Sequence, residues 1–335
     1  MIIKKTILTF LFFANALVFS QDIHWSQYMQ NPIFLNPGLT GNFDGNFRFV
    51  ANGRWQWKSV TVPYQTINIT ADSRGLGLPN LGLGVMFFYD VAGDSKLSTI
   101  EFMVSGAYSL NLSKDSVHRI MPGIQFGLNY RQIDYANLKF DSQYNGFYYD
   151  PAIANGEIFP TMKKANFNLN VGVVYTWEVN ARKKVNVGVS LHNITKPDQS
   201  FFQVKQIRRE FRTTIFAEGQ FRVADKWDVL PSLYFGAQGK YLEIIFGGWG
   251  RYILKQEKGE YMGLFAGVWY RALDAGSIGV GFEWNTLWAG LTYDLNFSKL
   301  TVASNARGGI EFSLRYILKY HKPKNVLYRI CPEYI

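Results

Sequence analysis

A serine and a histidine that could act as nucleophile and base lie in the segment VGVSLHN, at Ser190 and His192. A serine hydroxyl becomes a nucleophile when a neighbouring histidine takes its proton, so this pair raises the question of a hydrolase. Alternate residues of one strand are not expected to hydrogen-bond in this way, and no nucleophile-elbow motif surrounds Ser190. The sequence therefore predicts a protein that is not an enzyme.

Residues that could bind a metal or a cofactor are equally sparse. The four histidines are His24, His118, His192 and His321. None of them has His-x-x-x-His spacing, and together with the single Cys331 they do not predict a zinc site. One cysteine also excludes an internal disulfide framework. The run GLGLPNLGLG at residues 75–84 opens no helix, as a dinucleotide-binding loop would, so we expect a glycine-rich turn there and no cofactor.

The composition is rich in aromatic rings and poor in charge. Aromatic residues make up 17% of the chain and charged residues 18%, beside 31 glycines, and the formal net charge is +10. A soluble protein would have difficulty burying so many rings, whereas a membrane barrel can direct them toward lipid. The basic balance could suggest nucleic acid, but the rings lie on alternating apolar faces, which lipid explains better. We therefore expect membrane lipid and no nucleic acid as a partner.

The first twenty residues have the features of a signal peptide. Lys4 and Lys5 supply the positive start, an apolar run follows at residues 6–19, and Ser20 is a small residue before a cleavage site. A transmembrane helix is the alternative, but the run is short for a helix that needs about 20 residues to span a bilayer. We expect residues 1–20 to be removed on export.

Apolar and polar residues alternate with a period of two through almost the whole mature chain, which predicts strands. In the first of them Phe49 lies on one face, whereas Arg48 and Arg54 lie on the other. Runs of about ten residues match tilted transmembrane strands and are about twice as long as ordinary soluble strands. Fourteen strands are expected, at residues 46–57, 64–73, 81–91, 98–111, 119–131, 166–178, 183–193, 210–223, 227–238, 240–254, 260–271, 277–285, 287–295 and 307–318.

The lengths of the connections test this count. Outer-membrane barrels have short turns on the periplasmic side and long loops outside. The longest predicted connections are 132–165, 194–209 and 296–306, and all three follow odd-numbered strands. They therefore share one side of the membrane. The sequence predicts an all-β fold: a transmembrane antiparallel up-and-down β-barrel of roughly 14 strands at residues 45–320, with both ends periplasmic.

The polar faces of the strands are expected to point into the barrel. They carry charges of both signs: Arg48, Arg54, Glu101, Arg212, Glu218, Arg222, Glu243, Arg251, Glu311 and Arg315. Two interpretations stay open, because these charges could satisfy one another or line a path or a ligand cavity. The same face carries large apolar residues, which suggest a constricted or plugged lumen: Phe216, Ile245, Phe265 and Trp269.

With a barrel expected, the N-terminal motif QDIHWSQYMQNPIFLNPGLTGN and the strand RFVANGRWQW resemble the start of the PorP/SprF family. These are outer-membrane proteins of the type IX secretion and gliding machinery of Bacteroidetes-type bacteria. The motif residues of the arm are Asn31, Pro32, Asn36, Pro37 and Gly41. The resemblance extends over the mature chain, through segments at 81–93, 187–201 and 293–316. The ending CPEYI is similar to the family's Cys-Pro tail, although Glu333 stands where members often carry a basic residue.

The resemblance implies an integral outer-membrane component of protein secretion that uses no cofactor. The implied partners are other type IX secretion components and a secreted cargo, such as a large adhesin, whose C-terminal signal domain the barrel binds or anchors at the cell surface. Aromatic residues of the 132–165 connection offer contact area at low entropic cost. They are Tyr144, Phe147, Tyr148 and Tyr149. A merely solvated loop is the other interpretation, and a porin or hydrophobic-solute channel is the alternative function.

The N-terminal arm, at residues 21–44, cannot be an ordinary strand, because Pro32 and Pro37 withhold backbone donors. Its apolar side chains nevertheless favour burial. We expect a periplasmic arm that folds back into the periplasmic mouth of the barrel as a plug, or docks against a periplasmic partner. The C-terminal tail, at residues 321–335, is also expected in the periplasm.

Overall fold

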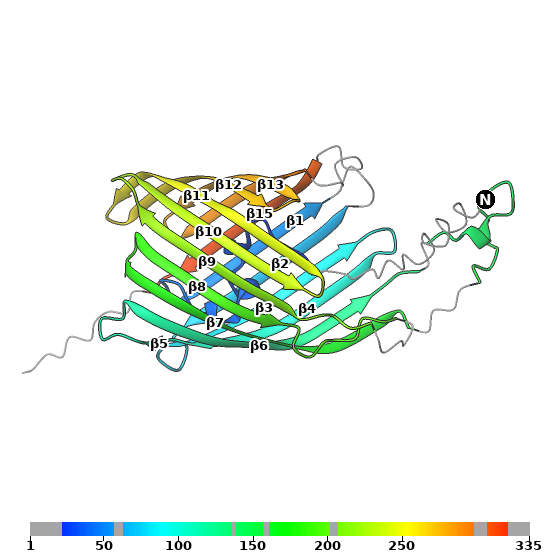
Figure 1. The fold of residues 1–335 in the computed structure, drawn as a ribbon, viewed down its shortest axis with the longest axis horizontal. Helices are drawn as coiled ribbons and strands as arrows, with labels where there is room; N and C mark the ends of the chain where they lie inside the picture. Colours follow the sequence, from blue (N-terminus) through cyan, green and yellow to red (C-terminus); the bar gives the residue numbers. More distant parts are fainter. Residues whose placement is uncertain are drawn as a thin grey trace, which may run out of the picture.

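Antiparallel strands close into a β-barrel in the computed structural model (Figure 1). The structure describes residues 22–56, 63–135, 138–156, 161–201, 207–297 and 307–320. The expected signal peptide, Trp57 and the C-terminal tail with Cys331 lie outside the described residues. Among the described residues, no helix is both long enough and apolar enough to cross a membrane.

The strands follow one another around the barrel in chain order. They are β1 Phe47–Gln56, β2 Tyr64–Arg74, β3 Leu81–Ala92, β4 Leu97–Tyr108, β5 Leu110–Asn111, β6 His118–Gln132, β7 Lys163–Asn180, β8 Lys183–His192, β9 Arg212–Arg222, β10 Trp227–Gln238, β11 Tyr241–Glu257, β12 Glu260–Arg271, β13 Ala275–Trp284, β14 Leu287–Asn296 and β15 Arg307–Leu318. Both β4 and β5 pair with β6, so together they form one wall strand. The first and last strands pair from Phe47↔Leu318 to Trp55↔Ile310 and close the ring. The predicted antiparallel barrel of 14 strands is confirmed.

The two ends of the barrel differ in the length of their connections. The loop end carries the long connections at 133–162, 193–211 and 297–306, and the turn end carries short ones such as 181–182 and 258–259. The strands are longer than expected in places, because β7 begins at Lys163 and β11 continues to Glu257. The expectation that the long connections share one end is confirmed.

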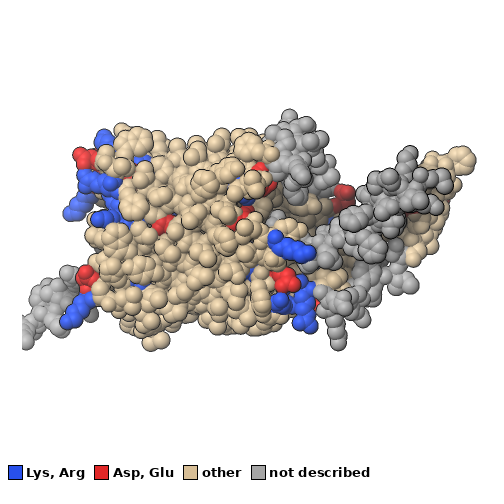
Figure 2. All heavy atoms as spheres, viewed as in Figure 1, with Lys and Arg blue, Asp and Glu red and all other residues tan. Residues whose placement is uncertain are grey.

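The alternation of the sequence separates an outer face from an inner one. On β3, Val85 and Phe87 are exposed on the outside, whereas Met86 and Phe88 are buried inside. Figure 2 shows that charged atoms gather toward the two ends of the visible face and leave the middle largely apolar. An outward apolar band between two charged rims is the surface expected of a membrane-spanning barrel.

The N-terminal arm lies inside the barrel, where Figure 1 shows it in blue. It forms three short helical turns, η1 Tyr28–Gln30, α2 Pro32–Leu35 and η2 Pro37–Leu39. Pro32 and Pro37 each stand at the start of a turn, where a missing N–H costs nothing. The turns therefore make backbone hydrogen bonds of their own, such as Leu35 N–H to the Asn31 carbonyl, and the arm enters no strand pairing among the described residues.

The arm supplies the centre of the core within the barrel. Its buried apolar residues are Trp25, Tyr28, Ile33, Leu35 and Leu39. They pack with wall residues that include all four apolar residues expected inside: Phe216, Ile245, Phe265 and Trp269. Three of the wall rings, Trp249, Trp269 and Trp288, meet edge to face at 4.7 and 5.9 Å. Edge-to-face geometry is the favoured arrangement of aromatic pairs, so this side of the core is firmly packed.

The path of the arm differs from the expected plug in one mouth. Its start, Asp22, bonds to Arg209 in a connection of the loop end. Its last turn lies at the other end, where Gly41 donates to Asp72 of β2. The arm therefore runs through the lumen from the loop end to the turn end, and continues into β1 there.

Candidate functional site

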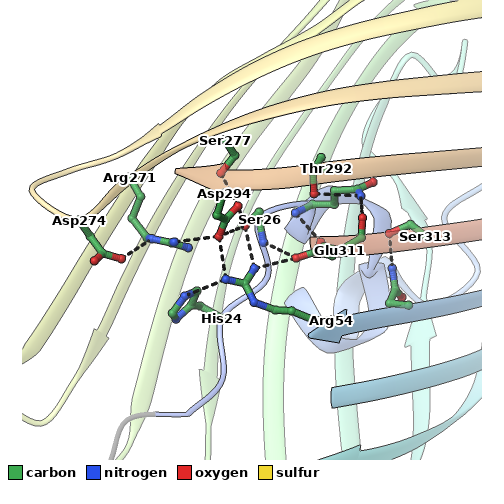
Figure 3. Close-up of polar contacts among 12 residues, drawn as sticks. His24, Ser26, Arg54, Arg271, Asp274, Ser277, Thr292, Asp294, Glu311 and Ser313 are labelled. Carbon is green, nitrogen blue, oxygen red and sulfur yellow. Dashed lines mark hydrogen bonds and ion pairs between the residues drawn. The ribbon is translucent and has the colours of Figure 1, made fainter. Parts of the chain in front are cut away.

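A buried ion cluster joins the arm to the wall near the loop end (Figure 3). Arg54 of β1 donates to Glu311 of β15 and to Asp294 of β14, each at 2.8 Å. It also donates to the hydroxyl of Ser26 in the arm at 2.7 Å. All three charged side chains are at most 2% exposed. Buried charges are tolerated only with such pairing, so the cluster depends on each of its members.

The two carboxylates of this cluster also hold the backbone and hydroxyl of the arm. Glu311 accepts the N–H groups of Ser26 and Gln27 at 2.8 and 2.7 Å. Asp294 accepts the Ser26 and Ser277 hydroxyls, both at 2.7 Å, and the Arg271 guanidinium at 3.0 Å. Charge-assisted hydrogen bonds are about twice as strong as neutral ones. The first turn of the arm is thus fixed to the wall by charged groups.

A second cluster fixes the beginning of the arm to a loop-end connection. Arg209 donates to Asp22 at 2.7 Å and also forms a short ion pair with Glu101 of β4. Asn193 donates to the other Asp22 oxygen at 2.9 Å. Burial acts to lower the pKa of Arg209, but the carboxylates of Asp22 and Glu101 raise it above its ordinary value. The 193–211 connection is therefore tied to the arm through charge.

The side chain of the motif residue Asn36 hydrogen-bonds to backbone carbonyl groups of the barrel wall. Its side-chain amide donates to the carbonyls of Val173 on β7 and Val189 on β8, at 3.3 and 3.0 Å. Its side-chain oxygen accepts the N–H of Gly38 at 2.8 Å. These bonds explain why an asparagine precedes the second proline of the arm, since it both starts the turn and anchors it to two strands.

Three wall glycines make room for the arm, and we call Gly82, Gly123 and Gly172 the glycine seat. A Cβ at Gly123 would lie 2.4 Å from the Pro37 carbonyl carbon. At Gly172 it would lie 2.2 Å from the Asn36 side-chain oxygen, and at Gly82 it would lie 2.3 Å from the Thr40 oxygen. No side chain fits at these distances, so the close approach of the arm requires glycine.

The pair Ser190 and His192 does hydrogen-bond, contrary to the expectation from its spacing. The Ser190 hydroxyl lies 3.0 Å from His192 Nε2 because both side chains point into the lumen, and the arm packs over them. The same hydroxyl lies within hydrogen-bond distance of the Leu35 carbonyl and of Thr214. Both members of the pair are 2% exposed. The pair anchors the arm, because the Ser190 hydroxyl donates to the Leu35 carbonyl.

Most of the ten charges expected in the lumen lie there. Fully buried are Arg48, Arg54, Glu101, Arg212 and Glu311. Partly buried are Glu218, Glu243, Arg251 and Arg315. Arg222 differs, because it ends β9 at the turn-end rim, where its side chain is 56% exposed and pairs with Asp225. The last residues of a strand extend beyond the lumen, and the alternation of apolar and polar residues does not show where this begins.

The second interpretation of these charges, a lined cavity, holds for part of them. Most are in ion pairs, such as Arg48 with Asp72 at 2.7 Å and Arg315 with Glu283 at 3.2 Å. Glu218 differs, because its hydrogen bond to Asn186 is accompanied by no ion pair within the described part of the chain. The lumen is therefore largely cross-linked, while the Glu218 carboxylate faces a cavity.

Cavities remain at both ends of the lumen, on either side of the arm. The loop-end cavity has a volume of about 230 Å³, and its lining includes Phe34, Phe88, Arg131 and Asp90. The turn-end cavity has a volume of about 260 Å³, and its lining includes Arg48, Lys184, Glu218 and Arg315. The residues between them belong to the arm and to the core described above.

The expected contact residues of the longest connection lie beyond the barrel wall at the loop end (Figure 1). Tyr144 pairs with Tyr149 in an isolated bridge, and the short tip between them carries Phe147 and Tyr148. Phe147 is 90% exposed, Tyr148 62% and Tyr144 58%. Tyr149 is partly buried and lies beneath the Lys139 ammonium. The described part of the connection thus presents Tyr144, Phe147 and Tyr148 to solvent.

Several residues that hold the arm were absent from the sequence-based set. Asp72 and Asp294 each share the inward face with neighbouring threonines, so the alternation of their strands could have identified them. Asp22 and Arg209 lie outside strands, and no periodic signal marks them. No group of His, Cys, Asp and Glu side chains with a metal-binding arrangement occurs in the described ranges.

The model of one protein family, described as type IX secretion system membrane protein PorP/SprF, matches residues 17–316. The chain belongs to the PorP/SprF family. The resemblance noted in the sequence is thereby confirmed, and with it an outer-membrane β-barrel role in the type IX secretion system. No functionally curated protein matches the chain.

Solved outer-membrane channels share the fold. A Pseudomonas aeruginosa FadL homologue has 12% identity and a TM-score of 0.50, over 87% of this chain and 94% of that chain. The Pseudomonas putida toluene transporter TodX has 9% identity and a TM-score of 0.49, over 88% of this chain and 93% of that chain. At such identities the likeness shows the architecture alone. The family itself gives this barrel an integral outer-membrane location.

Proposed function

We propose that this PorP/SprF barrel binds the C-terminal signal domain of a secreted cargo and holds the cargo at the cell surface. Long loops of outer-membrane barrels face outward and short turns face the periplasm, which directs the loop end to the exterior. The C-terminal tail then begins on the periplasmic side. Other type IX secretion components complete the set of partners.

The observation that carries this proposal is the exposed aromatic tip at residues 144–149. Aromatic side chains in contact with water are costly unless a partner covers them, and such residues dominate protein interfaces. The tip stands on the longest connection, clear of the barrel wall and of the lipid-facing band (Figure 1). A cargo domain arriving from outside would meet this surface first.

Serine in place of Tyr144, Phe147 and Tyr148 together is expected to reduce the cargo retained at the cell surface at least about tenfold, as the loss of one interface hot spot already would. The reason is the loss of apolar contact area, since the tip makes no lumenal contact. The measurement is surface labelling of the cargo in intact cells, with heat-modifiable migration on gels to verify the folded barrel.

Leu273→Ser provides a matched control for the loop experiment. Leu273 is 90% exposed, as Phe147 is, and it lies in the 272–274 turn at the same end of the barrel. This variant should retain the cargo fully. Unchanged cargo levels in the triple variant, or an equal loss in the control, would remove the tip from the proposal.

A small-solute channel is the second candidate function, because a cavity lies at each end of the lumen. The arm between the cavities argues against free passage, since its side chains pack directly against the wall. Ion conductance of the purified wild-type barrel in planar bilayers would favour the channel. We expect no steady open state.

We also propose that the barrel is not an enzyme, and Ser190→Ala tests this. The variant should leave cargo secretion at the wild-type level, with a loss of stability of about 1 kcal/mol for the hydrogen bonds removed. Ser105→Ala is the control, because Ser105 is likewise buried and bonds to Thr40 of the arm at 2.6 Å. Secretion that fails in Ser190→Ala alone would indicate catalysis.

A further inference from the structure

One row of inward-facing residues near the loop end contains two charged side chains that form no ion pair within the described ranges. The strand ladders place five residues of neighbouring strands side by side in this row: Thr66, Asp90, Thr99, Arg131 and Lys164. Lys164 is matched by Asp198 of the adjacent connection. Asp90 and Arg131 are the charged members that remain without such a partner.

These two side chains use little of their hydrogen-bonding capacity. A guanidinium carries several N–H donors, but the described contacts of Arg131 are the Gln199 carbonyl at 3.4 Å and the ring of Phe201 at 5.7 Å. One oxygen of Asp90 accepts the Thr66 hydroxyl at 2.7 Å, and the other accepts no hydrogen bond from the described residues. Arg131 therefore suits a carboxylate and Asp90 suits an ammonium.

The spacing of the two charges leaves room for a ligand between them. Thr99 separates Asp90 from Arg131 in the row, so their backbones lie two strand spacings apart, about 9.5 Å. Both side chains line the loop-end cavity, together with Thr99. A free amino acid carries its ammonium and its carboxylate on one carbon atom, and it is small enough to lie between two groups at this spacing.

The other charges of the cavity are already matched. Arg209 pairs with Asp22 at 2.7 Å and also with Glu101. Apart from His24, the ionisable Asp, Glu, Lys and Arg side chains of the lining are thus one matched pair and the two separate charges, which balance each other. A ligand with one charge of each sign leaves no charge of the site unmatched, whereas a ligand with a net charge leaves one.

The floor of the cavity is apolar and belongs partly to the arm. Phe88 lies one step deeper than Asp90 on the inner face of β3 and stacks on Phe34 of the arm, with the ring centres 5.7 Å apart. Ile23 of the arm and Leu97 of β4 add to this lining. Apolar surface beside a few polar groups is typical of small-molecule sites. The floor therefore suits an aliphatic side chain.

The cavity lies at the mouth of the barrel. Its lining includes Gln56 at the end of β1 and Tyr64 at the start of β2. It also includes Ala92 at the end of β3 and Leu97 at the start of β4. All four residues adjoin connections of the loop end, which faces outward in barrels of this kind. Since the arm lies beneath the cavity, the space is a binding site and not a passage.

We propose that the loop-end cavity binds a free α-amino acid with an apolar side chain. The carboxylate of the ligand pairs with Arg131, its ammonium pairs with Asp90, and its side chain packs on Phe88 and Ile23. The last residue of a peptide offers the same carboxylate and side chain, and the experiment separates these two sources. The proposal goes beyond cargo binding, because it concerns the lumen and not the aromatic tip.

Saturation-transfer NMR of L-leucine with the purified barrel in detergent micelles tests the site. We expect a Kd of about 0.1–1 mM, within the range for a ligand of this size. Glycine lacks the apolar side chain, L-leucinamide lacks the carboxylate and N-acetyl-L-leucine lacks the ammonium. Each should bind at least about tenfold more weakly than L-leucine. These comparisons use the wild-type barrel, so they remain valid if a variant folds poorly.

Arg131→Gln and Asp90→Asn assign the two charges to the two ends of the ligand. Arg131→Gln should weaken L-leucine at least about tenfold and leave L-leucinamide, which has no carboxylate, unchanged. Asp90→Asn should weaken L-leucine by a similar factor and leave N-acetyl-L-leucine unchanged, and asparagine retains an oxygen for the Thr66 hydroxyl. A merely structural effect would instead weaken every ligand together.

Arg222→Gln and Asp225→Asn are the matched controls, because they remove the same groups from an exposed pair at the turn end. Both should bind L-leucine as the wild type does, and heat-modifiable migration on gels verifies that every variant is folded.

Equal binding of L-leucine by the wild type, Arg131→Gln and Asp90→Asn would overturn the site. Glycine that binds as tightly as L-leucine would contradict the apolar part of the proposal. Tighter binding of the tripeptide glycyl-glycyl-leucine than of L-leucine would replace the free amino acid by a peptide C-terminus. None of these outcomes depends on cargo retention, so the two proposals fail separately.

Discussion

Arg54→Met is expected to lower the free energy of unfolding by about 3–5 kcal/mol, the cost typical of breaking a buried ion pair by removing one partner. Methionine leaves Glu311 and Asp294 in the lumen without the guanidinium that both now share at 2.8 Å. The two carboxylates are almost completely buried, so water cannot replace the lost partner. The measurement is a urea titration of the barrel in detergent micelles, followed by tryptophan fluorescence.

Two further variants decide whether charge is the cause. Arg222→Met removes the same group from an exposed pair with Asp225, and it should cost at most about 1 kcal/mol. The double variant Arg54→Met with Glu311→Gln should recover part of the loss, because one unpaired charge is then neutral. If Arg54→Met and Arg222→Met unfold at the same urea concentration, the buried cluster does not hold the arm and wall together.

Gly123→Leu is expected to displace the second half of the arm from the lumen. The new side chain would begin 2.4 Å from the Pro37 carbonyl carbon and 2.5 Å from the Gly38 nitrogen, which are backbone atoms that cannot turn aside. Either the arm or the wall must move, and the wall is held by continuous pairing of β6 with β7. The residues around Pro37 should therefore move away from the glycine seat.

Chymotrypsin reports this displacement directly. The arm between residues 22 and 47 contains no lysine or arginine but several aromatic and leucine sites, so trypsin would not detect its release. We expect the wild-type arm to resist chymotrypsin, and cleavage in Gly123→Leu to be at least about tenfold faster, the factor given by 1.4 kcal/mol of easier local opening. Planar bilayers should show ion conductance in the variant.

Gly106→Leu supplies the control, since Gly106 faces outward on β4 and a Cβ there meets nothing nearer than 3.7 Å. Its arm should resist chymotrypsin and its barrel should stay closed. An arm that is cleaved equally fast in the wild type would contradict burial altogether. An uncleaved, non-conducting Gly123→Leu barrel would show that the wall yields instead of the arm.

The strands and their count could be predicted because their signal is local. Side chains of a strand alternate with a period of two. The outward position of Phe87 and the inward position of Met86 can therefore be predicted without knowledge of any other strand. The connection lengths then separated the two ends, and the motif of the arm indicated the family. The same alternation could not predict the position at which a strand extends beyond the lumen. Arg222 is the example, because it was expected inside and is exposed at the rim.

The pairing of the lumenal charges depended on ring closure. Arg54 and Glu311 are 257 positions apart in the chain, and they meet because the last strand pairs with the first. Sequence placed each of them on an inward face but could not choose among the many inward partners. The Ser190 and His192 contact depended in the same way on the arm that packs over the pair.

The sequence by itself determined a barrel of alternating strands, its long and short ends, and an arm that could not pair as a strand. Only the tertiary structure decided that the arm runs the length of the lumen and that Asn36 reaches carbonyls 137 and 153 positions away. The physical reason is the range of the forces involved. Backbone alternation and proline geometry act between neighbours, whereas the seat of the arm requires several distant strands to be in place together.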